Sequence, residues 1–412
     1  MVAEQAEIGP VTCAGCGLLC DDVRLDCSGE AVRLQPSCAL GAQWFTERVR
    51  RPAGLPVAMV NGEPTDLESA LTRAGELLRG ARRPLVYGFD ASTVEDARAA
   101  FALADRLGAL VVTENMTGAW PGAPALPLRG ATTATLGEIR DRSRLVVIWG
   151  EDPEVTHPRL LERLRFGGGA PASSVARRTL VVIDNRDTAT ARRADLRLKW
   201  PRERDLEALV TLHALQRKVA PAAGDLNAQL GGLLTRIADV PHVAFVYGPG
   251  LTGGDGGQRR ALALHELTRA LSHERHVVTL ALTRAPGTTG VQDALAWQTG
   301  YAGNVDLASG HPELHTATQS GEGADDVDVA LRIDGAPAAL APGVAEIALC
   351  SHPTSGPGPD PQVSIRTAAA GVHAAGTAHR LDGVPLALQA PLAGDAPTTA
   401  ELLVRLLAEV AP

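Results

Sequence analysis

The chain has few aromatic residues and almost no lysine. Phe, Trp and Tyr make up 3% of its 412 residues, and Lys199 and Lys218 are its only lysines. Its formal net charge is -8, so it lacks the clustered basic face that nucleic-acid binding requires, and we expect no nucleic-acid partner. It also lacks a run of about 20 apolar residues that could cross a bilayer. We therefore expect a globular protein without a membrane partner.

The N-terminal residues show no targeting signal. The first ten, MVAEQAEIGP, contain neither a basic region nor an apolar segment of the kind found in secretory signals. This pattern predicts a cytoplasmic location, where thiols stay reduced. We therefore interpret the six cysteines as metal ligands or buried thiols rather than as disulfides.

Four of the six cysteines are close together in the sequence: Cys13, Cys16, Cys20 and Cys38. A CxxC pair supplies two thiolates from one turn, and two more can complete the ligand set of an iron–sulfur cluster or of zinc. We take these four as a candidate metal site for a [4Fe-4S] cluster or zinc, or as a site that has become vacant. The alternative is a loop in which cysteine packs as a small apolar residue. No other pattern of catalytic or cofactor-binding residues is evident, and the histidines show no HxH or HExxH spacing.

Short runs rich in Val, Ile and Leu predict strands that are buried on both faces of a sheet. Amphipathic stretches at 205–219 and 258–272 predict helices between them. Capping boxes predict three helix starts, at Thr65 with Glu68, Ser92 with Glu95, and Thr398 with Glu401. The predicted strands are 85–89, 109–113, 145–149, 180–184, 243–247, 276–282, 327–333 and 345–350.

This alternation predicts an α/β protein with two doubly wound, Rossmann-like and mostly parallel sheets after a small Cys-rich segment. We expect three domains. Residues 1–55 would form the four-cysteine segment, residues 56–200 an α/β domain, and residues 201–412 a second α/β domain that ends in a β segment and a final helix.

Several motifs, in order along the chain, resemble the B-type subunit of formylmethanofuran dehydrogenase, a member of the molybdopterin oxidoreductases. The first is CAGCGLLCDD at 13–22, followed by CALG from Cys38. The others are VIWGEDP at 147–153 with a following His-Pro, VIDNRDTAT at 182–190, WQTGY at 297–301 and GTAHRLDGVP at 376–385. The resemblance runs along almost the whole chain.

The resemblance implies a [4Fe-4S] cluster beside a molybdenum or tungsten bis-pterin centre, whose metal is bound by a cysteine followed by histidine. The corresponding stretch here, 117–124, contains neither residue. Ala119 has no ligand atom, and Trp120 puts an indole where the resemblance places the metal. Arg202 and Glu203 also replace the family's Pro-Gly-x-Asp turn. We therefore expect the molybdenum or tungsten pterin to be absent.

A B-type subunit that lacks its metal ligand is similar to the one in the formyltransferase/hydrolase complex of aerobic methylotrophs. This resemblance implies a role in one-carbon metabolism and formaldehyde oxidation. A formyl group would pass from formyl-tetrahydromethanopterin to a methanofuran-like carrier and be released as formate. The catalytic centres would lie on amidohydrolase-like and formyltransferase-like partner subunits, and the complex would also contain a further structural subunit. This chain would be a non-catalytic scaffold, a pseudoenzyme.

Two alternatives stay open. The chain could be a redox-active molybdenum or tungsten pterin subunit in which the four-cysteine cluster passes electrons. It could also bind a nucleotide or folate-like carrier through its glycine-rich stretches at 248–250 and 253–257.

Overall fold

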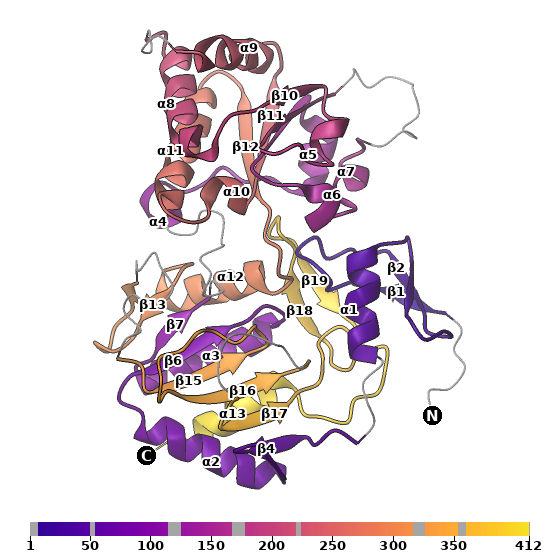
Figure 1. The fold of residues 1–412 in the computed structure, drawn as a ribbon, viewed down its shortest axis with the longest axis vertical. Coiled ribbons are helices and arrows are strands. Elements are labelled where there is room, and N and C mark those ends of the chain that lie inside the picture. Colours follow the sequence, from indigo (N-terminus) through magenta and orange to yellow (C-terminus); the bar gives the residue numbers. More distant parts are fainter. Residues whose placement is uncertain are drawn as a thin grey trace. The chain divides into compact units, whose positions relative to one another are not determined.

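The computed structural model describes residues 7–49, 54–113, 125–166, 178–219, 224–315, 326–352 and 360–411. The chain forms two compact units, one from Met1–Gly118 and Ala285–Pro412, and the other from Ala119–Arg284. The second unit is therefore an insertion between two halves of the first, as the colours in Figure 1 show. Within the described residues, no helix has both the length and the apolarity needed to cross a membrane.

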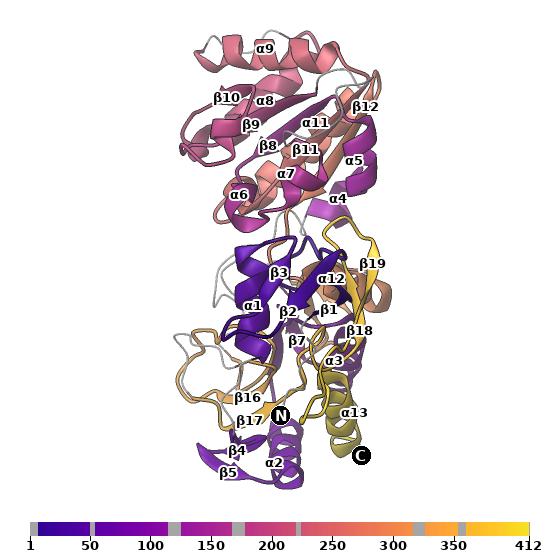
Figure 2. The ribbon, with the colours of Figure 1, turned by 90° about the vertical axis from the view of Figure 1, so that its right-hand side faces the viewer.

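The N-terminal part of the first unit is a small antiparallel sheet with a helix. The strands β1 (Ile8–Val11), β2 (Val23–Asp26) and β3 (Arg33–Gln35) pair in that order. The helix α1 (Ala39–Val49) follows and contacts β3, and Figure 2 shows it beside the three strands. The predicted four-cysteine segment is thus a structural element of its own within the first unit.

A nine-stranded sheet forms the body of the first unit, in the order β14-β13-β7-β6-β15-β16-β17-β4-β5. Its five central strands are parallel, and antiparallel strands extend both edges. The strands are β4 (Ala58–Val60), β5 (Glu63–Thr65), β6 (Pro84–Gly88), β7 (Leu110–Val112), β13 (Val305–Asp306), β14 (Glu313–Leu314), β15 (Val329–Ile333), β16 (Ala345–Cys350) and β17 (Val363–Arg366).

Both faces of this sheet are buried. Val86 of β6 belongs to the large core on one face, while its neighbours Leu85 and Tyr87 belong to a smaller core on the other, as the alternation of side chains along a strand requires. Helices α2 and α3 contact strands of the sheet, and α13 packs against both helices. The helices are α2 (Leu67–Gly80), α3 (Val94–Leu107), α12 (Thr288–Thr299) and α13 (Thr399–Glu409), and a hairpin of β18 (Gly376–His379) and β19 (Pro385–Leu388) contacts α12 and α3.

The second unit contains a five-stranded, fully parallel sheet in the order β10-β9-β8-β11-β12. Its strands are β8 (Leu145–Trp149), β9 (Thr179–Ile183), β10 (Leu196–Leu198), β11 (His242–Tyr247) and β12 (His276–Ala281). Its helices are α4 (Leu126–Arg129), α5 (Leu136–Arg142), α6 (Pro153–Thr156), α7 (Leu160–Arg163), α8 (Asp205–Gln216), α9 (Leu226–Ala238), α10 (Pro249–Thr252) and α11 (Gly257–Leu271), with short 3-10 turns at Ala191–Arg193 and Arg202–Arg204.

The direction in which successive strands are added to this sheet reverses between β8 and β11. From β8 the chain moves outward to β9 and β10, and it then returns to the other side of β8. In open parallel sheets, ligands bind at such a switch point, beyond the carboxyl ends of the strands. The sheet order therefore places a candidate site after β8 and β11.

The predicted fold class is confirmed: a Cys-rich segment precedes two largely parallel α/β sheets. All eight predicted strands are present. The predicted domain boundary at residue 200 does not coincide with the two units, which divide near residues 118 and 284. The residues of 56–200 are shared between the sheets, because β6 and β7 lie in one and β8 to β10 in the other.

Two of the three predicted capping boxes were wrong by one residue. The N-cap of α2 is Asp66, which accepts from Ser69 N, and that of α3 is Thr93, which forms its box with Asp96. The freed Glu95 carboxylate instead accepts from Thr377 N at 2.9 Å. A neighbouring polar residue offered an equally good cap in both cases.

The third box, between Thr398 and Glu401, is confirmed at the start of α13. Replacing Thr398 with Ala leaves a backbone N–H of the first turn without its side-chain acceptor, so we expect the free energy of unfolding to fall by about 1 kcal/mol. Urea unfolding of Thr398→Ala measures the loss, and Thr398→Ser, which keeps the hydroxyl, is the control. Equal losses in the two variants would contradict a capping role.

Candidate functional site

The structure brings the four predicted cysteine ligands into one neighbourhood. Cys13 N donates to Cys20 O at 2.8 Å and closes the loop that carries Cys16, while Cys38 immediately precedes α1. Burial raises the pKa of the Cys13 thiol, and the charges of Cys16, Cys20 and Cys38 raise it further. All six cysteines of the chain are thiols.

Two glycines let α1 lie directly against the cysteine loop. A Cβ on Gly15 would lie 2.9 Å from the Cα of Gly41, and a Cβ on Gly41 would lie 2.9 Å from the sulfur of Cys13. Both distances are shorter than real Cβ contacts allow. The backbone of the start of α1 therefore lies directly against the backbone of the loop. This contact places Cys38 near the other three cysteines.

The chemistry of this donor set fits the cluster that the resemblance implies. Four thiols from one loop and one helix start are the ligand set of a [4Fe-4S] cluster, which would supply one-electron transfer there. Cys13, Cys16, Cys20 and Cys38 would hold it. The raised pKa of Cys13 means that the thiol stays protonated unless a metal replaces the proton.

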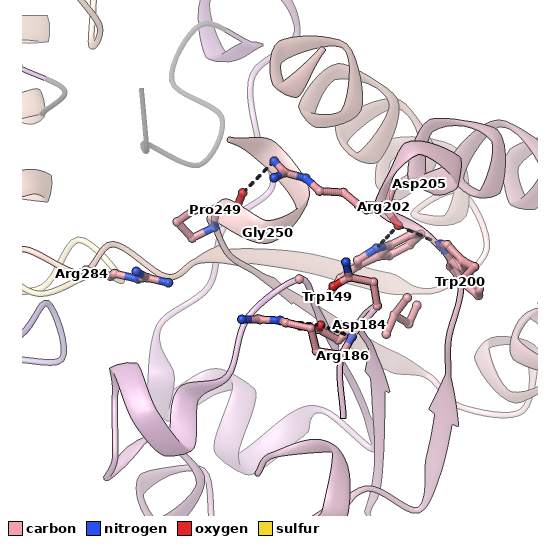
Figure 3. Close-up of a pocket in the computed structure, with 12 residues that line it drawn as sticks. Trp149, Asp184, Arg186, Trp200, Arg202, Asp205, Pro249, Gly250 and Arg284 are labelled. Atoms are coloured by element: carbon pink, nitrogen blue, oxygen red, sulfur yellow. Dashed lines mark hydrogen bonds and ion pairs between the residues drawn. The ribbon is translucent and has the colours of Figure 1, made fainter. Parts of the chain in front are cut away.

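In the second unit, a cavity of about 330 Å³ lies at the carboxyl ends of the parallel strands (Figure 3). It lies at the switch point between β8 and β11. Residues after β8, β9 and β11 line it together with the start of α8 and Arg284. The fold therefore places a polar cavity where sheets of this kind bind ligands.

The floor of the cavity is a contact between two backbone turns. Gly150 follows β8 with a φ of +67°, and a Cβ on it would lie 2.3 Å from Leu251 N. A Cβ on Gly250 would lie 2.2 Å from the carbonyl oxygen of Gly150. Neither position can carry a side chain, because the neighbouring atoms belong to the backbone and cannot turn away.

Asp205 holds one side of the cavity together. Its Oδ1 accepts hydrogen bonds from the indole nitrogen of Trp149 at 3.0 Å and from that of Trp200 at 2.8 Å. The two rings pack edge to face with centroids 5.9 Å apart. Burial raises the pKa of Asp205, and the two indole hydrogen bonds oppose this increase. One buried carboxylate thus fixes both aromatic walls, as the dashed lines in Figure 3 show.

Arg202 crosses the cavity and binds the glycine-rich loop. Its guanidinium donates to the carbonyls of Pro249 and Gly253. Arg260 donates from the other side to Gly253 O at 2.8 Å and Asp255 O at 3.0 Å. The carbonyls of this loop are therefore engaged by two arginines.

This arrangement does not fit the pterin nucleotide that the resemblance implies. Close approach of a nucleotide to backbone needs a small residue at the turn before α8, and Arg202 places a long side chain there. The stretch with Ala119 and Trp120, where the family's metal-binding cysteine is expected, lies outside the described residues. We derive no chemical step through a pterin-bound metal.

Two further carboxylates of this region are buried, and each is paired with an exposed arginine. The Glu151 side chain is 1% exposed and accepts from Arg284 at 3.1 and 3.2 Å. The Asp184 side chain is 3% exposed and accepts from Arg186 at 3.1 and 3.2 Å. Arg186, Arg202 and Arg284 all line the cavity, but Asp184 and Asp205 line it too, and the ion pairs of Arg186 and Arg284 offset their charges, so the lining is of mixed charge.

The structure joins two of the sequence motifs that carried the resemblance. Asp152, from the motif at 147–153, accepts from the backbone nitrogens of Ala189 at 3.1 Å and Thr190 at 2.9 Å, both in the motif at 182–190. Nearby His157 is fully buried, and its Nε2 lies 2.9 Å from Thr283 O, so its role is structural.

Two motifs of the first unit, at 297–301 and 376–385, also meet. Nδ1 of His379 lies 2.6 Å from Asp293 Oδ2, and its ring packs against Trp297. The turn that follows contains an ion pair, in which Arg380 donates to Asp382 at 2.7 and 2.9 Å. Leu381 N in this turn donates to Gly17 O of the cysteine loop at 2.9 Å, which fixes the loop to the body of the unit.

Sequence reasoning missed Asp205 as the acceptor of two indoles and missed a cluster of Glu138, His242 and His276. The first had no local signal, because Trp149 lies far from Asp205 in the sequence. The second had one: His276 begins a predicted strand and His242 directly precedes another, and neighbouring strands of a parallel sheet begin side by side.

Comparison with known proteins gives a consistent picture, although no family model matches the chain. The chain is 28% identical over 417 residues to the B-type subunit of the tungsten-containing formylmethanofuran dehydrogenase 2 of Methanocaldococcus jannaschii, with 92% of each chain covered. The same subunit of Methanococcus maripaludis is 25% identical over 401 residues, again with 92% of each chain covered.

A solved structure shares the fold. A chain of the formyltransferase/hydrolase complex from Methylorubrum extorquens, determined in complex with methylofuran, matches with a TM-score of 0.68 and 22% identity. The match covers 86% of this chain and 98% of that one. Over almost its whole length, the chain is therefore a homologue of the B-type subunit of formylmethanofuran dehydrogenase.

Proposed function

We propose that this chain is a non-catalytic, organising subunit of a formyltransferase/hydrolase complex. In that complex a formyl group moves from formyl-tetrahydromethanopterin to a methanofuran-like carrier and is released as formate. The partners would be an amidohydrolase-like subunit, a formyltransferase-like subunit and a further structural subunit. The proposed location is the cytoplasm.

One observation carries the proposal: a full-length homologue of a tungsten-containing subunit has no cysteine or histidine in the stretch 117–124. The resemblance implies a tungsten or molybdenum centre that is bound there by a protein thiolate, and Ala119 and Trp120 cannot supply one. The arginine across the switch-point cavity supports the same conclusion, because it fills space that a pterin nucleotide would need.

The rest of the fold supports a subunit that keeps its shape after losing its cofactor. Buried hydrogen bonds from two indoles to Asp205 and backbone contacts at Gly150 and Gly250 hold the relict site together without a ligand. The fold shared with a chain of the methylofuran-bound complex supports partners of that type.

The alternative is a redox-active tungsten or molybdenum subunit. The four neighbouring cysteines favour it, because a [4Fe-4S] cluster next to a pterin centre would carry electrons. In the non-catalytic proposal the same cysteines hold a cluster or zinc in a structural role.

Purification from the native host tests the proposal. We expect a tagged copy of this chain to co-purify with the amidohydrolase-like and formyltransferase-like subunits in a complex that converts formyl-tetrahydromethanopterin to formate. The isolated chain should show no dye-linked formate or formylmethanofuran oxidation. A chain that purifies alone and reduces a viologen dye with such a substrate would overturn the proposal and favour the redox alternative.

A further inference from the structure

A cluster of metal-binding side chains lies in the second unit, at the end of the sheet opposite the cavity. His242 is the first residue of β11 and His276 the first residue of β12, whereas the cavity lies beyond the last residues of β8, β9 and β11. Glu138 of α5 faces both histidines. Among the described residues, this is the one group of three or more His, Cys, Asp or Glu side chains whose donor atoms all lie within 4.8 Å of one another.

The sheet register brings the two histidines together. His242 and His276 are paired residues of neighbouring parallel strands, so their side chains project from the same face of the sheet. Their ring centroids are 4.7 Å apart with an interplanar angle of 42°. The Nε2 atoms of both rings approach the same atom, Glu138 Oε1, which makes the arrangement convergent.

The distances fit ligands of one metal ion better than they fit hydrogen bonds. Nε2 of His242 lies 3.5 Å from Glu138 Oε1, and Nε2 of His276 lies 3.4 Å from it. Good N–H···O hydrogen bonds are about 2.7–3.2 Å long. Two ligands bound to zinc at about 2.0–2.1 Å with a tetrahedral angle between them are separated by about 3.4 Å.

The other ring nitrogen of His242 has a partner that fixes the ring. Its Nδ1 lies 2.9 Å from the hydroxyl of Ser143, and the side chain is only 7% exposed. Metal-binding histidines are commonly oriented in this way, with one nitrogen bound to a neighbouring group and the other turned to the ion. Ser143 thus holds Nε2 of His242 toward Glu138.

We propose that Glu138, His242 and His276 form a site for a divalent cation of the zinc class. Two imidazoles and one carboxylate supply three protein ligands, and water completes the coordination on the open side, where the His276 side chain is 57% exposed. The bound ion links α5 to the starts of β11 and β12. The site is separate from the four cysteines, which belong to the other unit.

Cobalt(II) titration of the full-length, chelator-treated chain tests this site. Cobalt bound by nitrogen and oxygen gives visible d–d absorption without the near-ultraviolet charge-transfer bands that thiolate ligands add, so the spectrum distinguishes it from cobalt at the cysteines. We expect one nitrogen- and oxygen-bound cobalt per chain. Zinc should displace it and raise the unfolding temperature of the chain, because it binds the folded form.

His276→Gln and His273→Gln form a matched pair, because both histidines are exposed and only His276 belongs to the cluster. We expect His276→Gln, and separately Glu138→Gln, to lower the affinity for the nitrogen- and oxygen-bound cobalt at least about tenfold. His273→Gln should leave it unchanged, and all three variants should keep the thiolate bands. The proposal is overturned if the parent chain gives only thiolate-type spectra, or if His276→Gln binds cobalt as the parent does.

Discussion

Replacing Gly250 with Ala is expected to destabilise the second unit by at least about 3 kcal/mol, or to prevent its folding. The added Cβ would lie 2.2 Å from the carbonyl oxygen and 2.7 Å from the carbonyl carbon of Gly150. These are backbone atoms at the junction of β8 and β11, so relief requires the two strands to separate. Urea unfolding of the full-length variant measures the effect.

Gly231 provides the control for this prediction. It lies in α9 of the same unit, and a Cβ added there meets nothing within 4 Å. Gly231→Ala should raise the free energy of unfolding by about 0.5–1 kcal/mol, because alanine favours the helix. If the two variants unfolded alike, the close contact between Gly150 and Gly250 would not exist as described.

Replacing Asp205 with Ala should lower the free energy of unfolding by about 2–5 kcal/mol. The substitution removes the acceptor of two buried indole N–H groups, at Trp149 and Trp200, and each unsatisfied donor costs about 1–3 kcal/mol. Because both indoles belong to the second unit, their near-ultraviolet circular dichroism during urea unfolding reports the loss locally.

Asp205→Asn is the matched variant. Asparagine keeps a side-chain oxygen in nearly the same place, so both indoles retain an acceptor, and we expect less than half of the loss seen for Asp205→Ala. The result that speaks against the bridging role is an Asn variant as unstable as the Ala variant. That outcome would assign the effect to the charge of Asp205 rather than to its hydrogen bonds.

The sequence indicated most of the fold because its strands are buried on both faces. Runs such as Leu145–Trp149 and Ala345–Cys350 consist almost entirely of apolar residues, and the observed strands have those bounds. A strand that is solvated on one face would have alternated with polar residues and been harder to separate from a helix.

The division into units could not be predicted in the same way. Nothing in the local pattern indicates that the chain leaves the first sheet after β7 and returns to it only with β13 and β15. Strand pairing depends on contacts between distant segments, such as β6 with β15, and these contacts have no local sequence signal. The expected boundary at residue 200 therefore fell inside the inserted unit.

Some features of the candidate site have a local sequence signal, whereas others depend on contacts between distant segments. The four cysteines could be proposed as ligands because the CxxC spacing itself places two thiols on one turn. The Asp205 bridge had no local signal, because it depends on which strands and helices become neighbours. The His242–His276 pair could be recognised only once β11 and β12 were known to be adjacent. The engagement of the glycine-rich loop by Arg202 and Arg260 likewise depends on tertiary contacts.

The chain combines the fold of its homologues with the loss of the residues that would bind tungsten or molybdenum. The chain aligns with tungsten-containing homologues over 92% of its length, and it has a cysteine-rich segment and two largely parallel sheets. It lacks a cysteine or histidine in 117–124, and it carries a long side chain over the switch-point cavity. These two departures separate the proposed organising role from a redox role.

Elemental analysis of the complex purified from its native host tests this claim most directly. Inductively coupled plasma mass spectrometry should find tungsten and molybdenum far below one atom per copy of this chain. Iron or zinc at the cysteines is compatible with the account. Tungsten or molybdenum close to one atom per chain, together with an extractable pterin, would contradict it.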